Sequence, residues 1–118
     1  MSDLTLLHNP KCSTSRAALD TLAATGVEPD VVQYLKEPLD EAALRDLLRK
    51  LEDEPGDLVR RDSFFKEQGL TEQDVASVDQ VVAVLVEHPR LMQRPIIIKG
   101  ERAIIGRPKE RVAPFVTG

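Results

Sequence analysis

The sequence has few of the residues on which several common architectures depend. Its 118 residues include one cysteine, one tyrosine, three phenylalanines and no tryptophan. A single cysteine excludes a disulfide within the chain, which fits the reducing environment of the cytoplasm. The scarcity of aromatic rings predicts a core built mainly from Leu, Val, Ile and Ala. We therefore expect a cytoplasmic protein with an aliphatic core.

The chain also lacks an excess of positive charge, a cluster of metal ligands and a long apolar run. Its formal charge of −4 argues against a nucleic-acid partner held by a basic surface, because such binding depends on neutralising phosphates. His8 and His88 lie far apart in the sequence and form no metal-ligand pattern with the one cysteine, so we expect no metal. The apolar run 81–86 is too short to span a membrane, and the N-terminus has no basic segment followed by a long apolar region.

The patterns that are present indicate one α/β domain over residues 1–118. Residues 3–7 are typical of a short buried strand, and apolar positions from Ser13 onward follow a helical period that Gly26 can end. The β-branched run 31–35 predicts a second strand, and the intervening helix favours parallel pairing of the two strands. The chain therefore opens as a β-α-β unit.

The rest of the chain divides into a mostly helical block and a strand-bearing end. Asp40 is a predicted N-cap for a helix over 41–51, and a broken helical region over 58–68 and a helix face over 78–86 complete an insertion of about 40–89. The acidic run 52–57 is typical of a solvated turn, with a contact to a partner as the alternative. Residues 96–98 and 103–105 predict a β-hairpin, and Pro108 suits the first turn of a final helix.

The stretch 8–16 carries the strongest chemical signal, because Cys12 lies between the first strand and the first helix. The first turn of a helix has unpaired backbone N–H groups and a partial positive charge, which favour a thiolate or a bound oxyanion. Lys11, Arg16 and His8 add positive charge or hydrogen bonds that can lower the pKa of the thiol. A lone cysteine is more often a small buried apolar residue, but polar and basic neighbours favour a catalytic thiol here.

The stretch 8–16 closely resembles the signature of the glutaredoxin-linked arsenate reductase family. The signature is present as His8-Asn9-Pro10, Cys12 and Thr14-Ser15-Arg16. The later landmarks of the family recur in order and at matching intervals: Tyr34-Leu35, a helix at Leu58-Val59-Arg60-Arg61, His88-Pro89, Arg94-Pro95-Ile96-Ile97-Ile98 and Gly106-Arg107-Pro108. The resemblance covers essentially the whole chain.

The resemblance implies a thioredoxin-like core with a helical insertion and the reduction of arsenate to arsenite through an arsenylated Cys12. It also implies that Arg60, Arg94 and Arg107 bind the oxyanion and that the Arg94–Pro95 bond is cis and faces the cysteine. Glutathione is then a co-substrate and glutaredoxin a partner, with another low-molecular-weight thiol as the alternative to glutathione and with no bound cofactor. Ser15 stands where a resolving cysteine occurs in other thioredoxin-like enzymes, so the reductant must come from outside.

Several roles remain open from the sequence. His8 can share a proton with the thiol or make a neutral structural hydrogen bond, and Ser15 can stabilise the thiolate or bond the helix backbone. Arg16 can tune the thiol or support its loop, and Arg61 is a rival of Arg60. Any single arginine is more often a solvated charge, but Arg94 and Arg107 each precede a proline at a strand boundary.

Two other functions compete with arsenate reduction. The first is a thiol oxidoreductase of the same fold that acts on glutathione-linked disulfides. The second is a Spx-type regulator that binds RNA polymerase. Regulators of that type commonly carry a Cys-x-x-Cys pair, which Cys12 and Ser15 do not provide, so catalysis is favoured over regulation.

Overall fold

Four short strands form one mixed sheet at the centre of the computed structural model, which describes residues 4–26 and 28–117. The order across the sheet is β2 (Asp30–Gln33), β1 (Leu4–His8), β3 (Ile96–Lys99) and β4 (Arg102–Ile105). β1 and β2 are parallel, as the predicted β-α-β unit requires, and the other pairs are antiparallel. The predicted hairpin is confirmed, whereas Asp3 of the first predicted strand lies outside the described residues.

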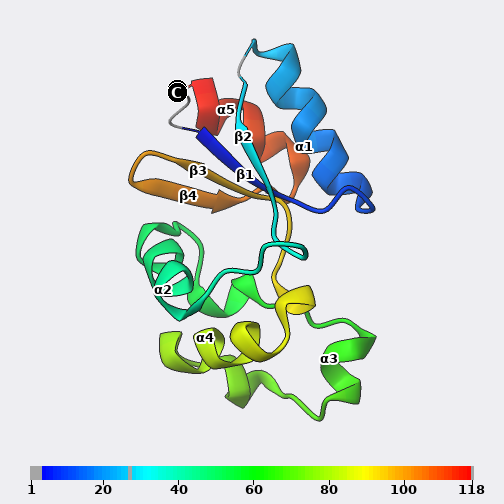
Figure 1. The fold of residues 1–118 in the computed structure, drawn as a ribbon, viewed down its shortest axis with the longest axis vertical. Helices are drawn as coiled ribbons and strands as arrows, with labels where there is room; N and C mark the ends of the chain where they lie inside the picture. The colour runs from blue at the N-terminus through cyan, green and yellow to red at the C-terminus, as the bar shows by residue number, and fades with distance from the viewer. Residues whose placement is uncertain (1–3, 27, 118) are drawn as a thin grey trace.

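The helices lie on both sides of this sheet (Figure 1). One side carries α1 (Ser13–Ala24) and α5 (Val112–Thr117), and the other carries the helical block with α2 (Glu41–Lys50), α3 (Ser63–Glu67) and α4 (Val78–Glu87). Short 3₁₀ turns join these elements, at η1 (Pro55–Leu58), η2 (Glu72–Val75), η3 (Pro89–Leu91) and η4 (Lys109–Arg111). The arrangement confirms the expected thioredoxin-like core with a helical insertion.

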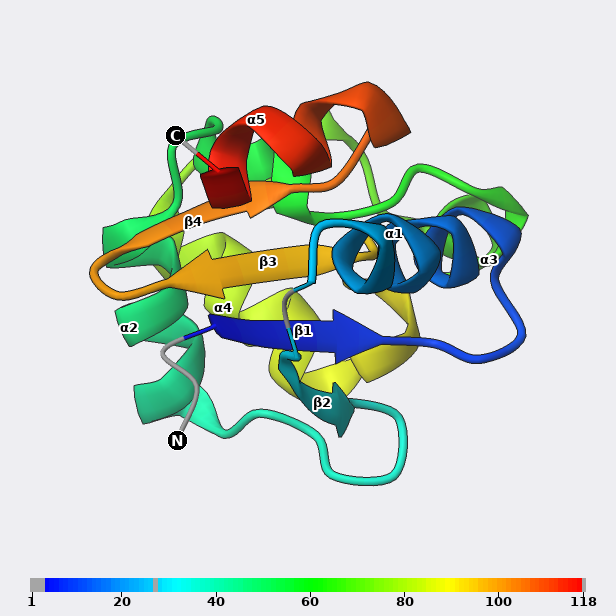
Figure 2. The same cartoon turned by 90° about the horizontal axis from the view of Figure 1, so that it is seen from above.

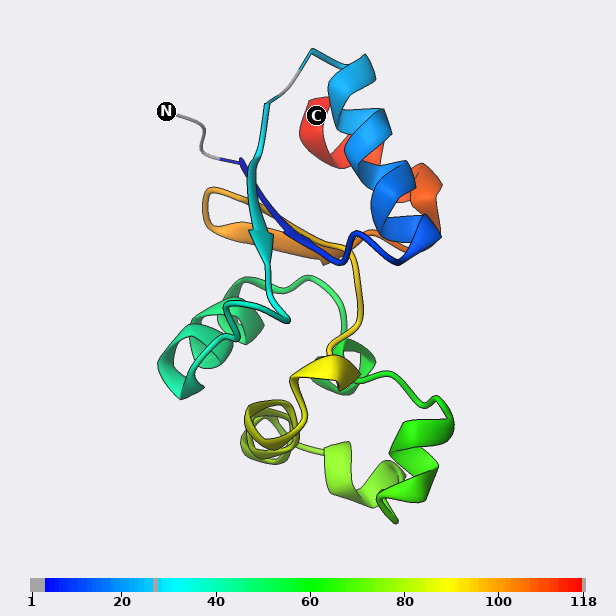
Figure 3. The same cartoon turned by 45° about the vertical axis from the view of Figure 1, so that its right-hand side comes forward.

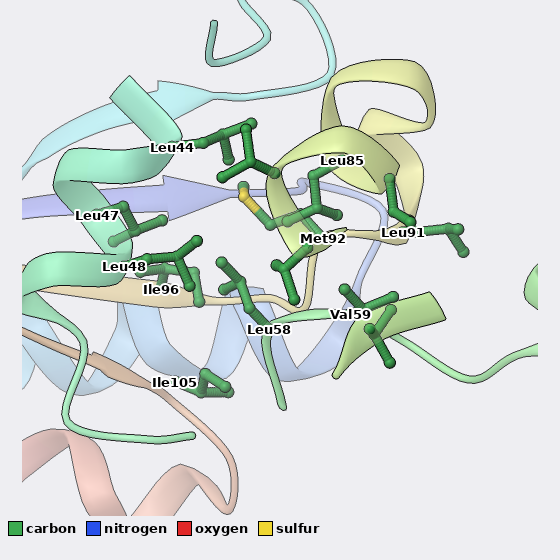
Figure 4. Close-up of a cluster of buried hydrophobic side chains, with 14 of the residues drawn as sticks. Leu44, Leu47, Leu48, Leu58, Val59, Leu85, Leu91, Met92, Ile96 and Ile105 are labelled. Atoms are coloured by element: carbon green, nitrogen blue, oxygen red, sulfur yellow. The ribbon is translucent and has the colours of Figure 1, made fainter. Parts of the chain in front are cut away.

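Alternation along the strands gives the sheet two apolar faces. Leu6 and Ile97 pack with α1 and α5, whereas their neighbours Leu7 and Ile96 pack with the insertion. The period of two follows from strand geometry, in which successive side chains point to opposite faces. The cluster on the insertion side is drawn in Figure 4, where it includes Leu44, Leu47, Leu48, Leu58, Val59, Leu85, Leu91, Met92, Ile96 and Ile105. As predicted, both clusters are mainly aliphatic.

Local signals set the ends of two helices as predicted. The Asp40 side chain caps α2 by accepting a hydrogen bond of 2.8 Å from the backbone N–H of Ala43. Gly26 follows α1 with φ of +79°, a conformation that glycine adopts without a steric penalty. The first of these ends fixes where the insertion leaves the sheet, and the second fixes where the chain turns towards β2.

The prediction of a helical Leu58-Val59-Arg60-Arg61 segment is wrong. The structure has the short turn η1 up to Leu58, then an extended segment, and α3 begins only after Asp62. Val59 forms an isolated antiparallel bridge with Met92, and the N–H of Arg60 donates to the carbonyl of Leu91 at 2.7 Å. These partners lie about thirty residues downstream, so no local helical pattern could show them.

The acidic run 52–57 is a turn, but it is not solvated throughout. Asp53 is half-buried, and its Oδ2 accepts a hydrogen bond of 3.0 Å from the backbone N–H of Ile105. Asp53 is half-buried because α2 ends beside the sheet, where Leu51 forms a parallel bridge with Ala103 of β4. Because this bridge brings the run against an edge strand, Asp53 points inward.

Candidate active site

Strand register brings four distant segments to one edge of the sheet. Leu7 lies opposite Ile96, and Ile96 lies opposite Ile105. β1 and β4 therefore end at the edge where β3 begins, and the parallel strand β2 ends there too (Figure 2). The segments that meet are the loop of Cys12, Tyr34, the Arg94–Pro95 pair and the Gly106–Arg107 pair.

Cys12 is the N-cap residue of α1, as the sequence predicts. Its backbone is extended, with φ of −99° and ψ of 123°, and its carbonyl accepts the first helical bond from Arg16 at 3.0 Å. Its own N–H donates to the carbonyl of Asn9 at 3.0 Å, and the Asn9 side chain accepts a hydrogen bond from Lys11. These bonds hold a tight loop in which the half-buried thiol faces the first turn of the helix.

Opposing effects act on the Cys12 thiol, and stabilisation of the thiolate prevails. Burial raises the pKa, but the backbone N–H of Ser15, the guanidinium of Arg94, the N–H of Thr14 and the charge of Arg107 lower it below its ordinary value. Two of these groups belong to the helix terminus and two come from loops at the other end of the chain. The helix end and the arginines therefore act together to ionise the nucleophile.

His8 and Ser15 contact each other. The hydroxyl of buried Ser15 lies 3.0 Å from Nδ1 of His8 and accepts a hydrogen bond of 3.0 Å from the N–H of Asn9. Burial lowers the pKa of His8, and the positive charge of exposed Arg16 lowers it further, which favours the neutral ring. The hydroxyl of Ser15 thus holds the loop, whereas the part of Ser15 that helps to stabilise the thiolate is its backbone N–H.

Arg107 and Arg94 lie beside the thiol. Nη2 of Arg107 is 3.4 Å from Sγ of Cys12, and its Nε donates to the carbonyl of Arg94 at 2.6 Å. The side chain of Arg94 interacts with both Cys12 and Tyr34, and its Nη1 donates to the carbonyl of Arg90. The Arg94–Pro95 and Arg107–Pro108 peptide bonds are both cis. The cis Arg94–Pro95 bond is the one that the family resemblance implies.

Two polar atoms at this edge are buried without a hydrogen-bond partner: the hydroxyl of Tyr34 and Nε of Arg94. The two side chains attract each other electrostatically, but no hydrogen bond of ordinary geometry joins these two atoms. Burial raises the pKa of Tyr34 despite the nearby positive charge of Arg94, so the phenol stays neutral. The sequence flagged Tyr34 only as a landmark, because nothing local showed where its hydroxyl would lie.

The structure separates Arg60 from Arg61. The guanidinium of Arg61 is committed to Glu72 and to the backbone carbonyls of Gly56 and Val59. Arg60 has a longer contact of 3.6 Å with Asp62, and its positive charge acts on Tyr34 against the upward effect of burial on the pKa of that residue. Arg60 is therefore the member of the pair with donors to offer an oxyanion.

Residues 4–26 and 28–117 contain no group of three or more His, Cys, Asp or Glu side chains that could hold a metal ion. Within the same ranges, no helix has the length and apolar character needed to cross a membrane. The groups that the structure brings together at this edge are a thiol with a lowered pKa and several cationic donors, an arrangement suited to attack on an anionic centre.

Comparison with known proteins places the chain in a family. The chain is 42% identical over 113 residues to the uncharacterized protein YfgD of Escherichia coli (strain K12), covering 94% of each chain. It is 36% identical over 114 residues to an arsenate reductase of Neisseria meningitidis, covering 95% of this chain and 97% of that one. A solved structure of an arsenate reductase from Vibrio cholerae superposes with a TM-score of 0.84 at 34% identity, covering 94% of this chain and 95% of that one. Residues 7–115 match the model of the ArsC family, and the chain belongs to that family.

Proposed function

We propose that this protein is an arsenate reductase that works through Cys12 and takes its electrons from an external thiol. One observation carries the proposal: the only cysteine of the chain lies at a helix N-terminus, 3.4 Å from a guanidinium nitrogen of Arg107. Relatives that bear the name arsenate reductase, with matches over nearly the whole chain, support the choice of substrate.

The first step joins sulfur to arsenic. The Cys12 thiolate attacks As(V) of dihydrogen arsenate, an arsenic–oxygen bond breaks, and that oxygen takes up a proton and leaves as water. The product is a Cys12 thioester of arsenate, and arsenic stays in the +5 state. Arg94, Arg107 and Arg60 bind the oxygens, because the planar guanidinium donates paired hydrogen bonds to oxyanions and stabilises the charge of the transition state.

The second step requires a second thiol. Glutathione attacks Cys12 sulfur, the sulfur–arsenic bond breaks, and its electron pair reduces As(V) to As(III), which leaves as arsenite after proton uptake. The mixed disulfide between Cys12 and glutathione is then reduced by glutaredoxin with further glutathione. Ser15 cannot replace this thiol, because a hydroxyl does not perform thiol–disulfide exchange.

A turnover assay tests the proposal directly. Wild-type protein with arsenate, glutathione and glutaredoxin should release arsenite over many cycles, and Cys12→Ser should release none above background. In protein freed of small thiols, the reaction without added thiol should stop within one equivalent. Sustained turnover without thiol, or turnover by Cys12→Ser, would contradict the mechanism.

The same samples test the competing oxidoreductase function. A glutathione-linked mixed disulfide replaces arsenate as the substrate, with the same reductants and the same Cys12→Ser control. If wild-type protein reduces this disulfide rapidly and releases no arsenite from arsenate, the protein is a thiol oxidoreductase and the arsenate proposal is wrong.

A further inference from the structure

The loop that carries Arg107 is held from outside by a contact between the insertion and the sheet. β4 is an edge strand, so its outer backbone groups have no strand partner. The segment after α2 supplies partners instead (Figure 3): the N–H of Glu52 donates to the carbonyl of Ala103 at 2.9 Å. Two residues along β4, the N–H of Ile105 donates to Oδ2 of Asp53 at 3.0 Å. The carboxylate thus continues the pairing to the end of the strand.

Arg111 extends this contact into the loop. Its Nη1 donates to Oδ1 of Asp53 at 2.9 Å and to the carbonyl of Ile105 at 3.0 Å, with a longer contact of 3.4 Å to the carbonyl of Arg107. One guanidinium nitrogen therefore bridges the insertion to the residues on both sides of Gly106. The Asp53 side chain keeps 16% of its exposure and that of Arg111 keeps 33%, so water screens the pair only in part.

The inner side of the same loop leaves no room for movement towards the sheet. The N–H of Gly106 donates to the carbonyl of Pro95 at 2.8 Å. A Cβ at Gly106 would lie 2.8 Å from Cδ1 of Ile97 and 2.9 Å from Cγ of Pro95, closer than real Cβ contacts. Pro95 on one side and Asp53 with Arg111 on the other therefore hold the backbone of residues 105–107 from both sides. From that backbone the side chain of Arg107 reaches Cys12 Sγ and the carbonyl of Arg94.

We propose that Asp53 and Arg111 are positioning residues that hold the guanidinium of Arg107 against Cys12. Their hydrogen bonds reach each other and the backbone of residues 105–107 and do not reach the thiol, so they act through that backbone. The inference deepens the proposed function, because a displaced Arg107 loses its contact with both the nucleophile and the substrate. A displacement of about 1 Å at such a distance can cost an enzyme a large part of its rate.

Asp53→Asn tests the inference, because asparagine keeps the shape of the side chain and removes its charge. We expect kcat/KM for arsenate to fall about tenfold, mainly through a higher KM, at temperatures where the variant is fully folded. In an Arg107→Ala background the same substitution should have no further effect, because the residue through which it acts is gone. An equal fall in both backgrounds would overturn the proposal. Arg111→Gln provides a second variant, and its effect should not add to that of Asp53→Asn.

Glu52→Gln is the matched control. Glu52 also pairs with an arginine of the hairpin region, Arg102, across the same junction. Those side chains keep 40% and 59% of their exposure, and neither contacts Arg107. Glu52→Gln should therefore leave kcat/KM unchanged. If Glu52→Gln lowered kcat/KM as much as Asp53→Asn does, any charge change at this junction would impair the reaction, and the specific role of Asp53 would be overturned.

A readout without arsenate separates this inference from the proposed function. Loss of Arg107 from the side of the thiolate should raise the pKa of Cys12, measured as the midpoint of its alkylation rate against pH. Asp53→Asn should shift that midpoint upward, as Arg107→Ala does, and Glu52→Gln should not. If wild-type protein reduces arsenate but Asp53→Asn shifts neither the midpoint nor KM, the inference fails and the proposed function stands. If wild-type protein does not reduce arsenate but the midpoint shifts, the positioning role stands alone.

Discussion

The two sides of the active site are held by different kinds of contact. Cys12, Arg94 and Arg107 lie next to strand ends, so the ladder of β1, β3 and β4 fixes their separation. Arg60 lies on an extended segment of the insertion, which is joined to the segment before β3 by two backbone bonds, Arg60 N–H to Leu91 and Gln93 N–H to Leu58. The difference indicates that the groups nearest the thiol depend first on the sheet, with Asp53 of the insertion holding the Arg107 loop from outside. Arg60 adds its charge from a segment that these two backbone bonds hold.

The largest effect beyond loss of Cys12 is expected on the sheet side. Arg94→Ala or Arg107→Ala should lower kcat/KM for arsenate by about 10² to 10³-fold, the typical cost of removing one donor from an oxyanion site. Arg94→Lys should restore little, because an ammonium cannot donate a planar pair of bonds. Steady-state kinetics with an unfolding curve for each variant measures this. Wild-type kinetics in both alanine variants would place the anion site elsewhere.

A smaller effect is expected on the insertion side, and it should separate two adjacent residues. Arg60→Ala should lower kcat/KM by about tenfold, since Arg60 offers donors from a segment with fewer constraints. Arg61→Ala should leave the kinetics unchanged and lower the free energy of unfolding by about 1 kcal/mol, because Arg61 is bonded to Glu72 and to carbonyls of its own segment. If Arg61→Ala impaired turnover and Arg60→Ala did not, our assignment within the pair would be reversed.

The smallest effect is expected on the free energy of unfolding, from a substitution of Tyr34 at the edge where the two sides meet. Tyr34 is 1% exposed, and its hydroxyl faces Arg94 without a hydrogen bond of ordinary geometry, so the cost of burying that hydroxyl is only partly offset. Tyr34→Phe keeps the ring and should raise the free energy of unfolding by about 1 kcal/mol in the absence of substrate. Chemical denaturation measures the change, and Tyr34→Leu is the control that loses ring packing. A loss of stability in Tyr34→Phe would show that the hydroxyl is bonded in solution.

The sequence predicted those parts of the site whose signals are local. Cys12 was identifiable because a proline, polar donors and a helical period surround it within a few residues. Arg94 and Arg107 were identifiable because each precedes a proline at a strand boundary, Arg94 before β3 and Arg107 after β4. The same holds for the N-cap at Asp40 and the turn at Gly26, where one residue type determines the backbone conformation.

The parts that the sequence missed depend on distant partners. The segment of Arg60 was predicted as helix because its pairing with residues 91–93 leaves no local trace. Asp53 was predicted as part of a solvated turn because its inward direction follows from the Leu51–Ala103 bridge, which joins residues far apart in the chain. The roles of His8 and Ser15 also needed coordinates, since either residue could have faced the thiol.

The central claim is that this edge of the sheet turns Cys12 into a thiolate beside a bound oxyanion. The rate of Cys12 alkylation against pH, with and without arsenate, tests it most directly. Because the site lowers the pKa of the thiol, the rate should reach half its maximum below the free value of about 8.5. Arg94→Ala and Arg107→Ala should each raise that midpoint, and arsenate should slow alkylation of the wild-type protein. A midpoint at or above about 8.5, unaffected by either substitution and by arsenate, would contradict the account.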